Sequence, residues 1–412
     1  MFCDWLNVWQ QFDGDWPDFL GGRVLSIEGA CGLARQRVID ADGVIGEAWG
    51  LAGGDDIEID YDVARFAQQR GSYETNLMVR MVAGKLEVRG NPSAYGRLDN
   101  LFGVGIDDGI AIYNEVLEQL GLPTFTEGEV RTNYHAKRGD GRGGPMVTYS
   151  GAHITRVDVT QNYAVGMGNV AHYHRWLAQQ KVSRSGPNDA DLEKFASWNY
   201  DTVYTSTSKY WINVKHYDKG EALMQRSLPE YLKRLKAAAR DGRIAKGDVR
   251  PLYQEAEDYL EKLALWCAEI GVTRGEWSMR NRWFVQHQGA GFWMPGETEG
   301  KLWDVVGAEM EKISKRAVVY QDESRDSLTL RERGALDAWR RGENLRESLS
   351  NGTFYRLRSS ILEKTGHDIA ARPLVKQSAD YRPVFFQVRA LSLKDAPIWY
   401  QRPSFPEMRL AA

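Results

Sequence analysis

Alternating apolar and polar positions predict strands in two parts of the chain. The predicted strands cover residues 76–83, 85–90, 153–160, 202–204, 209–219 and 272–277. The first two flank Gly84 and predict a hairpin that stops at Asn91-Pro92, because proline cannot donate to a strand ladder. Residues 202–204 and 209–219 predict a second hairpin.

Apolar residues at helical spacing predict helices between these strands and over the last hundred residues. The predicted helices cover residues 106–120, 169–180, 229–240, 251–269, 328–341, 344–349 and 353–364. Ser227 is a plausible N-cap for the third of these, with proline in its first turn. This mixture of strands and helices predicts an α+β protein. We expect helices on one face of its sheet and the functional site on the other face.

Composition and length set the frame for this fold. At 412 residues the chain is too long for one ordinary core, and we predict three blocks: a strand-rich block at 1–130, a second at 131–300, and a helical block at 301–412. A net charge of −3 means that any contact with nucleic acid must come from local basic patches. Three isolated cysteines and no apolar stretch of membrane length favour a cytoplasmic protein.

Three strand-like segments carry residues suited to phosphoryl transfer. Tyr217-Asp218-Lys219 closes the segment 209–219, and the flanking segments contain Arg156-x-Asp158 and Arg274-x-Glu276. Because alternate side chains share one face of a strand, Tyr217 lies with Lys219, Asp158 with Arg156, and Glu276 with Arg274. A phenol to attack phosphorus, a cation, and two carboxylates of the kind that hold a divalent ion could therefore meet on one sheet face.

Two further basic regions are open to two interpretations each. Residues 131–145 form a glycine-rich loop with Lys137 and Arg138, which is either a solvated loop or a contact to single-stranded nucleic acid. Residues 331–364 hold eight Lys/Arg against five Asp/Glu. A short helix, a turn and a helix bearing Arg356 and Arg358 have the outline of a helix-turn-helix, or else form a structural bundle with surface arginines.

His172-Tyr173-His174 has the form of a metal-binding signature, but the pair falls within a predicted helix. Residues two apart lie about 200° apart around a helix and cannot ligate one ion together. We therefore interpret this motif as a decoy.

The order of the site motifs resembles the gene II family of replication initiators from filamentous bacteriophages and, more distantly, the rolling-circle Rep proteins of staphylococcal plasmids. The ordered segments are Arg156-x-Asp158, Thr202-x-Tyr204, Tyr217-x-Lys219 and Arg274-x-Glu276. Segments outside the site also look like the family: Phe2-Cys3-Asp4-Trp5-Leu6, Gly90-Asn91-Pro92, Asp99-Asn100-Leu101-Phe102-Gly103, Thr353-Phe354-Tyr355-Arg356 with Asp368-Ile369, and Trp399-Tyr400-Gln401-Arg402-Pro403. The resemblance covers nearly the whole chain, and its weight lies in the collinearity of the motifs.

The resemblance implies an antiparallel-sheet tyrosine nickase (HUH/Rep-like) that starts rolling-circle replication of phage DNA. By position, Tyr217 would be the nucleophile that stays attached to the 5′ phosphate, with Lys219 beside it. Asp158 and Glu276 match acidic positions expected to bind Mg²⁺ or Mn²⁺. Thr160 stands where the plasmid relatives often carry a second acid, so Asp4, another residue or water would complete the ligand set.

The implied partners are supercoiled origin DNA and the replicative helicase and polymerase of an infected bacterial host, in its cytoplasm and away from membranes. Arg156 and Arg274 would hold flanking phosphates or pair with the adjacent acids. Two alternatives remain: a catalytically silent regulator that binds the origin or single strands, and a nuclease that uses water and forms no covalent adduct.

Overall fold

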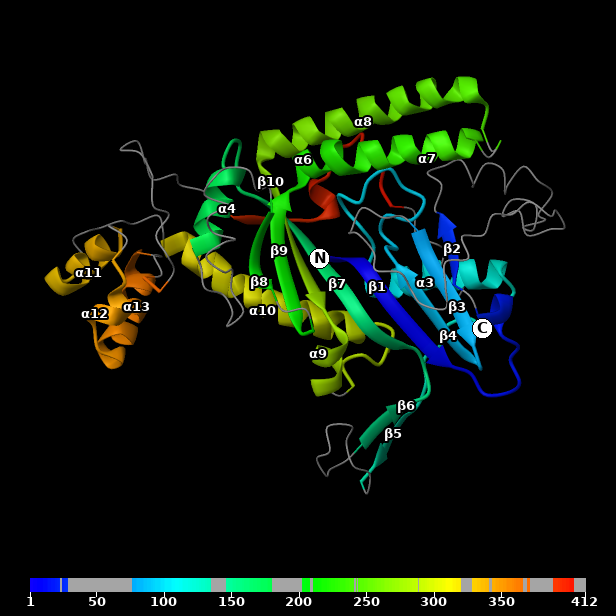
Figure 1. The fold of residues 1–412 in the computed structure, drawn as a ribbon, viewed down its shortest axis with the longest axis horizontal. Helices are drawn as coiled ribbons and strands as arrows, with labels where there is room; N and C mark the ends of the chain where they lie inside the picture. The colour runs from blue at the N-terminus through cyan, green and yellow to red at the C-terminus, as the bar shows by residue number, and fades with distance from the viewer. Residues whose placement is uncertain are drawn as a thin grey trace.

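The computed structural model shows a large twisted sheet with helices packed against it (Figure 1). The structure describes residues 1–22, 24–28, 76–134, 146–179, 202–207, 210–240, 242, 244–287, 289–319, 328–340, 343–365, 369–370 and 388–403. None of the helices in these residues is long and apolar enough to cross a membrane.

Nine strands of the described residues form this sheet. They are β1 (Phe2–Gln11), β2 (Leu25–Glu28), β3 (Asn76–Val82), β4 (Lys85–Gly90), β7 (His153–Ala164), β8 (Thr202–Thr207), β9 (Ile212–Asp218), β10 (Val272–Met279) and β11 (Arg389–Leu391). Their order is β2-β3-β4-β1-β7-β10-β9-β8, and β11 pairs with β7 beyond the start of β1. A separate hairpin of β5 (Val130–Asn133) and β6 (Met146–Tyr149) projects from the sheet (Figure 1).

Every pair of neighbouring strands in the sheet is antiparallel, so the predicted α+β class with an antiparallel sheet is confirmed. Both predicted hairpins are present, as β3–β4 and β8–β9. Because β1 lies between β4 and β7, strands from both sides of residue 130 belong to one sheet. The sheet therefore continues across the predicted boundary between blocks at residue 130. The finer assignment to the nickase fold remains a prediction.

One face of the sheet is apolar and covered by helices (Figure 1). These helices are α3 (Ile106–Gln119), α4 (Val170–Gln179), α9 (Asn281–Gln286) and α10 (Thr298–Val319). Leu6, Val157 and Trp277 are buried on this face, and burial of each such side chain contributes about 1.5–3 kcal/mol. The hydroxyl of Tyr113 on α3 donates to the carbonyls of Leu6 and Gly90, which fixes the helix on β1 and β4.

The opposite face is covered at one end by a second group of helices. They are α6 (Lys219–Ala222), the π-helical η2 (Leu223–Ser227), α7 (Leu228–Arg240) and α8 (Val249–Ile270). The short 3₁₀ turn η3 (Lys246–Asp248) leads into α8. Two other 3₁₀ turns are η1 (Phe19–Gly22) and η5 (Leu393–Asp395). Leu101, Leu263 and Tyr400 belong to one buried cluster that joins the 98–104 loop, α8 and the C-terminal segment. The remainder of this face carries polar side chains together with a small apolar cluster that includes Trp5 and Met78.

The turn from α8 into β10 requires glycine. Gly271 has φ of 67°, and a Cβ there would lie 2.0 Å from the carbonyl oxygen of Gly166. The left-handed conformation and the close backbone contact both exclude a larger residue. This turn sets the start of β10, the strand that carries Arg274 and Glu276.

The last helices form their own small core. They are α11 (Leu330–Arg340), α12 (Leu345–Ser348) and α13 (Asn351–Thr365), and they match three predicted helices closely. Trp339, Phe354 and Ile361 are buried together, and Glu332 on α11 accepts from Ser360 and Lys364 on α13. These contacts fit a structural bundle and leave the helix-turn-helix assignment a prediction.

Candidate active site

Tyr217 lies at the centre of a buried polar cluster on the second sheet face. It pairs in register with Arg274 of β10, and Glu276 pairs with Lys215 one step along. The Tyr217 hydroxyl donates to Oε1 of Glu276 at 2.5 Å, and Nζ of Lys215 is 2.6 Å from Oε2 of the same carboxylate. The phenol is 3% exposed and Glu276 is fully buried. A nucleophile, a carboxylate and a cation are therefore in direct contact.

The surroundings of Tyr217 and Glu276 shift the pKa values of both groups. Burial, and then the negative charge of Glu276, raise the pKa of Tyr217 above its ordinary value. Burial opposes ionisation of Glu276, but Lys215 and Arg274 outweigh it and hold the pKa of the carboxyl well below its usual range. At neutral pH the phenol is therefore neutral and donates to an ionised carboxylate.

The prediction that Lys219 lies on the same strand as Tyr217, beside it on one face, is wrong. The strand ends at Asp218, whose side chain accepts from the backbone N–H of Glu221 and begins α6, so the alternation of strand side chains stops there. Lys219 is buried and donates to Oδ1 of Asn100 at 2.6 Å. Lys215 instead lies next to the phenol, with Nζ 5.4 Å from the ring centroid of Tyr217.

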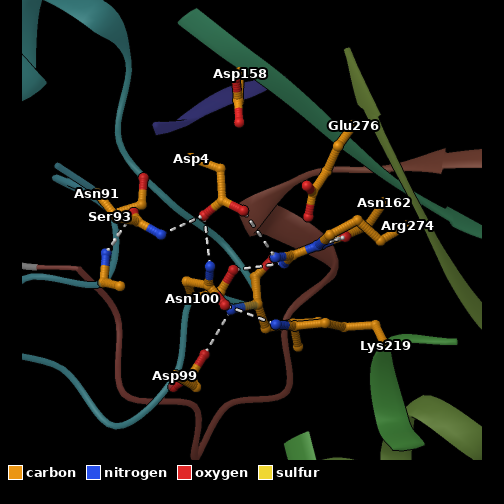
Figure 2. Close-up of polar contacts among 12 residues, drawn as sticks. Asp4, Asn91, Ser93, Asp99, Asn100, Asp158, Asn162, Lys219, Arg274 and Glu276 are labelled. Atoms are coloured by element: carbon orange, nitrogen blue, oxygen red, sulfur yellow. Dashed lines mark hydrogen bonds and ion pairs between the residues drawn. The ribbon is translucent and has the colours of Figure 1, made fainter. Parts of the chain in front are cut away.

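Asp4 lies at a bulge that turns it into the same cluster (Figure 2). Cys3 pairs with Val159 and Trp5 with Asp158, so Asp4 is an extra residue on β1, and bulges of this kind re-aim side chains next to active sites. Oδ1 of Asp4 accepts hydrogen bonds from two side-chain amides, those of Asn91 at 3.0 Å and Asn100 at 2.5 Å. Burial, and then Glu276, raise the pKa of Asp4.

Arg274 is structural in this geometry, which contradicts its predicted contact to a DNA phosphate. Its side chain has no exposed surface. Its guanidinium contacts Asn162 Oδ1 at 2.9 Å, the carbonyls of Asn100 and Leu101 at 2.5 and 2.8 Å, and Asp4 Oδ2 at 3.6 Å. Arg274 therefore ties β10 to β7, β1 and the 98–104 loop, and its ion-pair partner is Asp4 rather than the adjacent Glu276 that the alternative interpretation named.

Asp158 shares the face of Tyr217 and Glu276, as the alternation of strand side chains predicted. Asp158 pairs with Ser278, and the pair of Thr160 with Glu276 lies two residues further along the two strands. Arg156 holds both of its oxygens, through Nε at 2.9 Å and Nη2 at 2.6 Å. Figure 2 shows Asp158, Asp4 and Glu276 around one region of the sheet face.

These carboxylates do not form an assembled site for a divalent ion. Arg156 neutralises Asp158, Lys215 neutralises Glu276, and Asp4 is held by amides and Arg274. Within the described ranges, no group of three His, Cys, Asp or Glu side chains could hold a metal ion. The donors are hard oxygens of the right chemistry, but in this arrangement cations already occupy them.

The other basic residues predicted to contact DNA either lie on α13 or fall outside the described residues. Lys137 and Arg138 lie outside the described residues. Arg356 and Arg358 both lie on α13, but residues two apart point about 200° apart, and only Arg356 is exposed. The two arginines therefore cannot face the same groove together.

The histidine pair lies within a helix, as predicted. His172 and His174 lie on α4, and His174 is buried with Nε2 2.7 Å from the hydroxyl of Thr273.

Two other tyrosines are relevant as rival nucleophiles. Tyr204 pairs with Lys215 and so shares the face of Tyr217, with its side chain half-buried. Tyr210 is 70% exposed in the turn between β8 and β9. Neither contacts a carboxylate among the interactions described for them, whereas Tyr217 does.

Sequence reasoning missed Lys215 and undervalued Asp4 and Asn100. The signal for Lys215 was present, because it lies two residues before Tyr217 on the same strand. The bulge that turns Asp4 inward and the long-range approach of Asn100 have no local signal in the sequence.

Comparison with known proteins supports the resemblance drawn from these motifs. The chain is 27% identical over 342 residues to the replication-associated protein of Escherichia phage If1, an alignment that covers 77% of this chain and 95% of that protein. No protein-family model matches the chain, and no solved structure matches it. The predicted resemblance is therefore confirmed: the chain is similar, over most of its length, to an inovirus gene II protein.

Proposed function

We propose that this protein is a site-specific DNA nicking and rejoining endonuclease that initiates rolling-circle replication of phage DNA. Tyr217 is the nucleophile, and the reaction passes through a 5′-phosphotyrosine intermediate. The observation that carries the proposal is the 2.5 Å hydrogen bond from the Tyr217 hydroxyl to the Glu276 carboxylate. A nucleophile within hydrogen-bond reach of a base is the arrangement that covalent catalysis requires.

In the proposed reaction, the phenolic oxygen attacks phosphorus and displaces the 3′ oxygen of the preceding nucleotide. Glu276 accepts the phenol proton as the new bond forms, because the raised pKa of Tyr217 disfavours a free phenolate beforehand. The departing 3′ oxygen takes up the proton that Glu276 received, directly or through water. The products are therefore a 5′-phosphotyrosyl strand and a free 3′ hydroxyl, which is the primer that a host polymerase would extend. In rejoining, a 3′ hydroxyl attacks the phosphotyrosine and the phenol recovers its proton.

The cations of the cluster have different roles. Lys215 contacts Glu276 and lies near the phenol ring, so it can stabilise charge that develops at the phosphate. Lys219 and Arg274 instead hold Asn100 and the 98–104 loop in place. Arg226 of η2 also lies near the ring, with its guanidinium 5.8 Å from the centroid.

A second candidate function is a catalytically silent regulator that binds the origin or single strands. The burial of Tyr217 at 3% exposure favours it, because a phosphodiester reaches the phenol only after neighbouring side chains shift. Incubation with supercoiled origin DNA and a denaturing gel distinguishes the two functions: a covalent protein–DNA band supports the nickase, and binding without that band supports the regulator. Nicked DNA without the band would indicate a nuclease that uses water.

Substitution of the base is expected to slow nicking strongly. In Glu276→Gln the phenol keeps a hydrogen-bond partner but loses the proton acceptor, so the nicking rate should fall by on the order of 10²- to 10⁴-fold. Ser278→Ala, on the same strand and face, is the matched control and should nick at close to the wild-type rate. A wild-type rate in Glu276→Gln would remove this residue from proton transfer.

The requirement for Mg²⁺ or Mn²⁺ remains a prediction from the resemblance, and the mechanism above takes no step through an ion. On that resemblance, EDTA should stop nicking and added Mg²⁺ should restore it. Restoration would mean that ion binding displaces Arg156 or Lys215 from its carboxylate. Nicking that continues unchanged in EDTA would contradict the prediction, and Asp158 and Glu276 would then act through their ion pairs.

A further inference from the structure

Arginines cross the sheet on the same face as Tyr217, beyond the buried cluster. Arg89 of β4 and Arg156 of β7 flank Asn7 of β1, because Asn7 pairs with both. Arg80 of β3 lies one step from Arg89, since it pairs with Glu87 and Met78 pairs with Arg89. Arg280 follows β10 on the same face, two residues after Ser278. The row runs perpendicular to the strands and starts at Asp158, next to the candidate active site.

We call one set of cations on this face the basic strip: Arg80, Lys85, Arg89, Arg156 and Arg280. The basic strip has fewer carboxylates than cations. On this part of the described face the acids are Glu87, which contacts Lys85 at 2.8 Å and Arg89 at 3.9 Å, and Asp158, which contacts Arg156. Nε of Arg280 is buried without a hydrogen-bond partner in the described part of the chain. Burial lowers the pKa of Arg89; Glu87 opposes this effect, whereas the positive charges of Arg80 and Arg156 add to it.

Aromatic rings lie among these cations. The Trp9 ring stacks on His153 with centroids 4.2 Å apart, and Nζ of Lys85 lies 4.9 Å from the Trp9 centroid. The guanidinium of Arg156 lies 5.0 Å from the Trp5 centroid. Trp5 is itself buried, so the planar groups that can stack on an unpaired base are the half-buried Trp9 ring and the arginine planes.

We propose that the basic strip holds the single-stranded DNA that leads to the nick. This inference rests on the proposed function, since it assigns the path of that substrate. Five steps between neighbouring strands separate β9 from β3, so the path is about 24 Å long at about 4.8 Å a step. Excess positive charge fits the phosphates, and planar groups among the cations fit unpaired bases rather than a stacked duplex.

The test compares two double variants that lose the same charge. Arg80→Gln with Arg89→Gln removes two cations of the strip, neither of them in the active site. Lys233→Gln with Lys301→Gln removes two exposed cations of helices α7 and α10, which contact Glu230 and Glu297 and do not belong to the strip. Binding of a labelled single-stranded origin oligonucleotide is measured by fluorescence anisotropy across a salt series.

Each phosphate contact on a single strand contributes about 0.7 to the slope of log affinity against log salt. The strip variant should therefore lose about 1.4 from the slope and on the order of 20-fold in affinity at about 0.1 M salt. The control should bind like wild type. Arg80→Lys with Arg89→Lys should recover most of the slope, which a purely structural role of these arginines would not explain.

Wild-type affinity and slope in the strip variant would overturn the inference. So would equal competition by a duplex of the same sequence, which would assign the strip to duplex phosphates. The proposed function fails separately: a Tyr217→Phe protein that still forms a covalent adduct would contradict the nucleophile but leave the strip measurement unaffected.

Discussion

Replacing Tyr217 with Phe is expected to abolish covalent attachment of origin DNA and to leave origin binding within about twofold of wild type. The hydroxyl is the proposed nucleophile, and it is engaged with Glu276 inside the protein rather than with solvent. The measurement is a denaturing gel with end-labelled origin DNA beside an anisotropy titration. Loss of a buried hydrogen bond costs about 1–3 kcal/mol, so the fold should survive.

The matched controls are the two neighbouring phenols. Tyr204→Phe changes a residue on the same face, and Tyr210→Phe changes an exposed one. Both should form the adduct at close to the wild-type level. An adduct in Tyr217→Phe that disappears in either of these variants would move the nucleophile to that residue.

Substitution of Arg274 is expected to have the largest effect on stability. Arg274→Ala removes the partner of buried Asp4 and empties the sites at the carbonyls of Asn100 and Leu101, so the free energy of unfolding should fall by about 3–5 kcal/mol. Urea denaturation followed by tryptophan fluorescence measures the change. Arg234→Ala on α7, a residue that is not fully buried, is the control and should change the free energy by less than about 1 kcal/mol.

The result also separates the two interpretations of Arg274. A phosphate ligand would weaken DNA binding on substitution while leaving the unfolding free energy almost unchanged. A structural arginine lowers that free energy first, and DNA binding only as the site loses its shape. Unchanged stability in Arg274→Ala would contradict the role that its contacts indicate.

Strand alternation was the sequence signal that predicted most of the site. Because side chains alternate with a period of two, Asp158, Glu276 and Tyr217 could be assigned to one face without knowledge of the sheet order, and the register confirms this. The same rule failed at Lys219, where the Asp218 cap turns the chain into a helix. Applied towards the N-terminus instead, it would have found Lys215.

The rest of the site depends on tertiary contacts that local patterns do not encode. Nothing in residues 2–11 indicates that β1 inserts between β4 and β7, or that a bulge turns Asp4 towards Arg274. Asn100 reaches Lys219 across 119 positions of sequence. Likewise, β11 reaches β7 from near the C-terminus. Both hairpins and most helices are local and were predicted closely, but α9 and α10 were missed, and strand order and loop contacts were not predicted.

The most direct test of the account is to identify the residue that carries the DNA. Wild-type protein is incubated with supercoiled origin DNA, the complex is digested with nuclease and protease, and the nucleotide-bearing peptide is sequenced by mass spectrometry. The account predicts a 5′-nucleotide linked through phosphate to the hydroxyl of Tyr217. A nucleotide on Tyr204, Tyr210 or any other residue, or nicked DNA with no modified peptide, would contradict it.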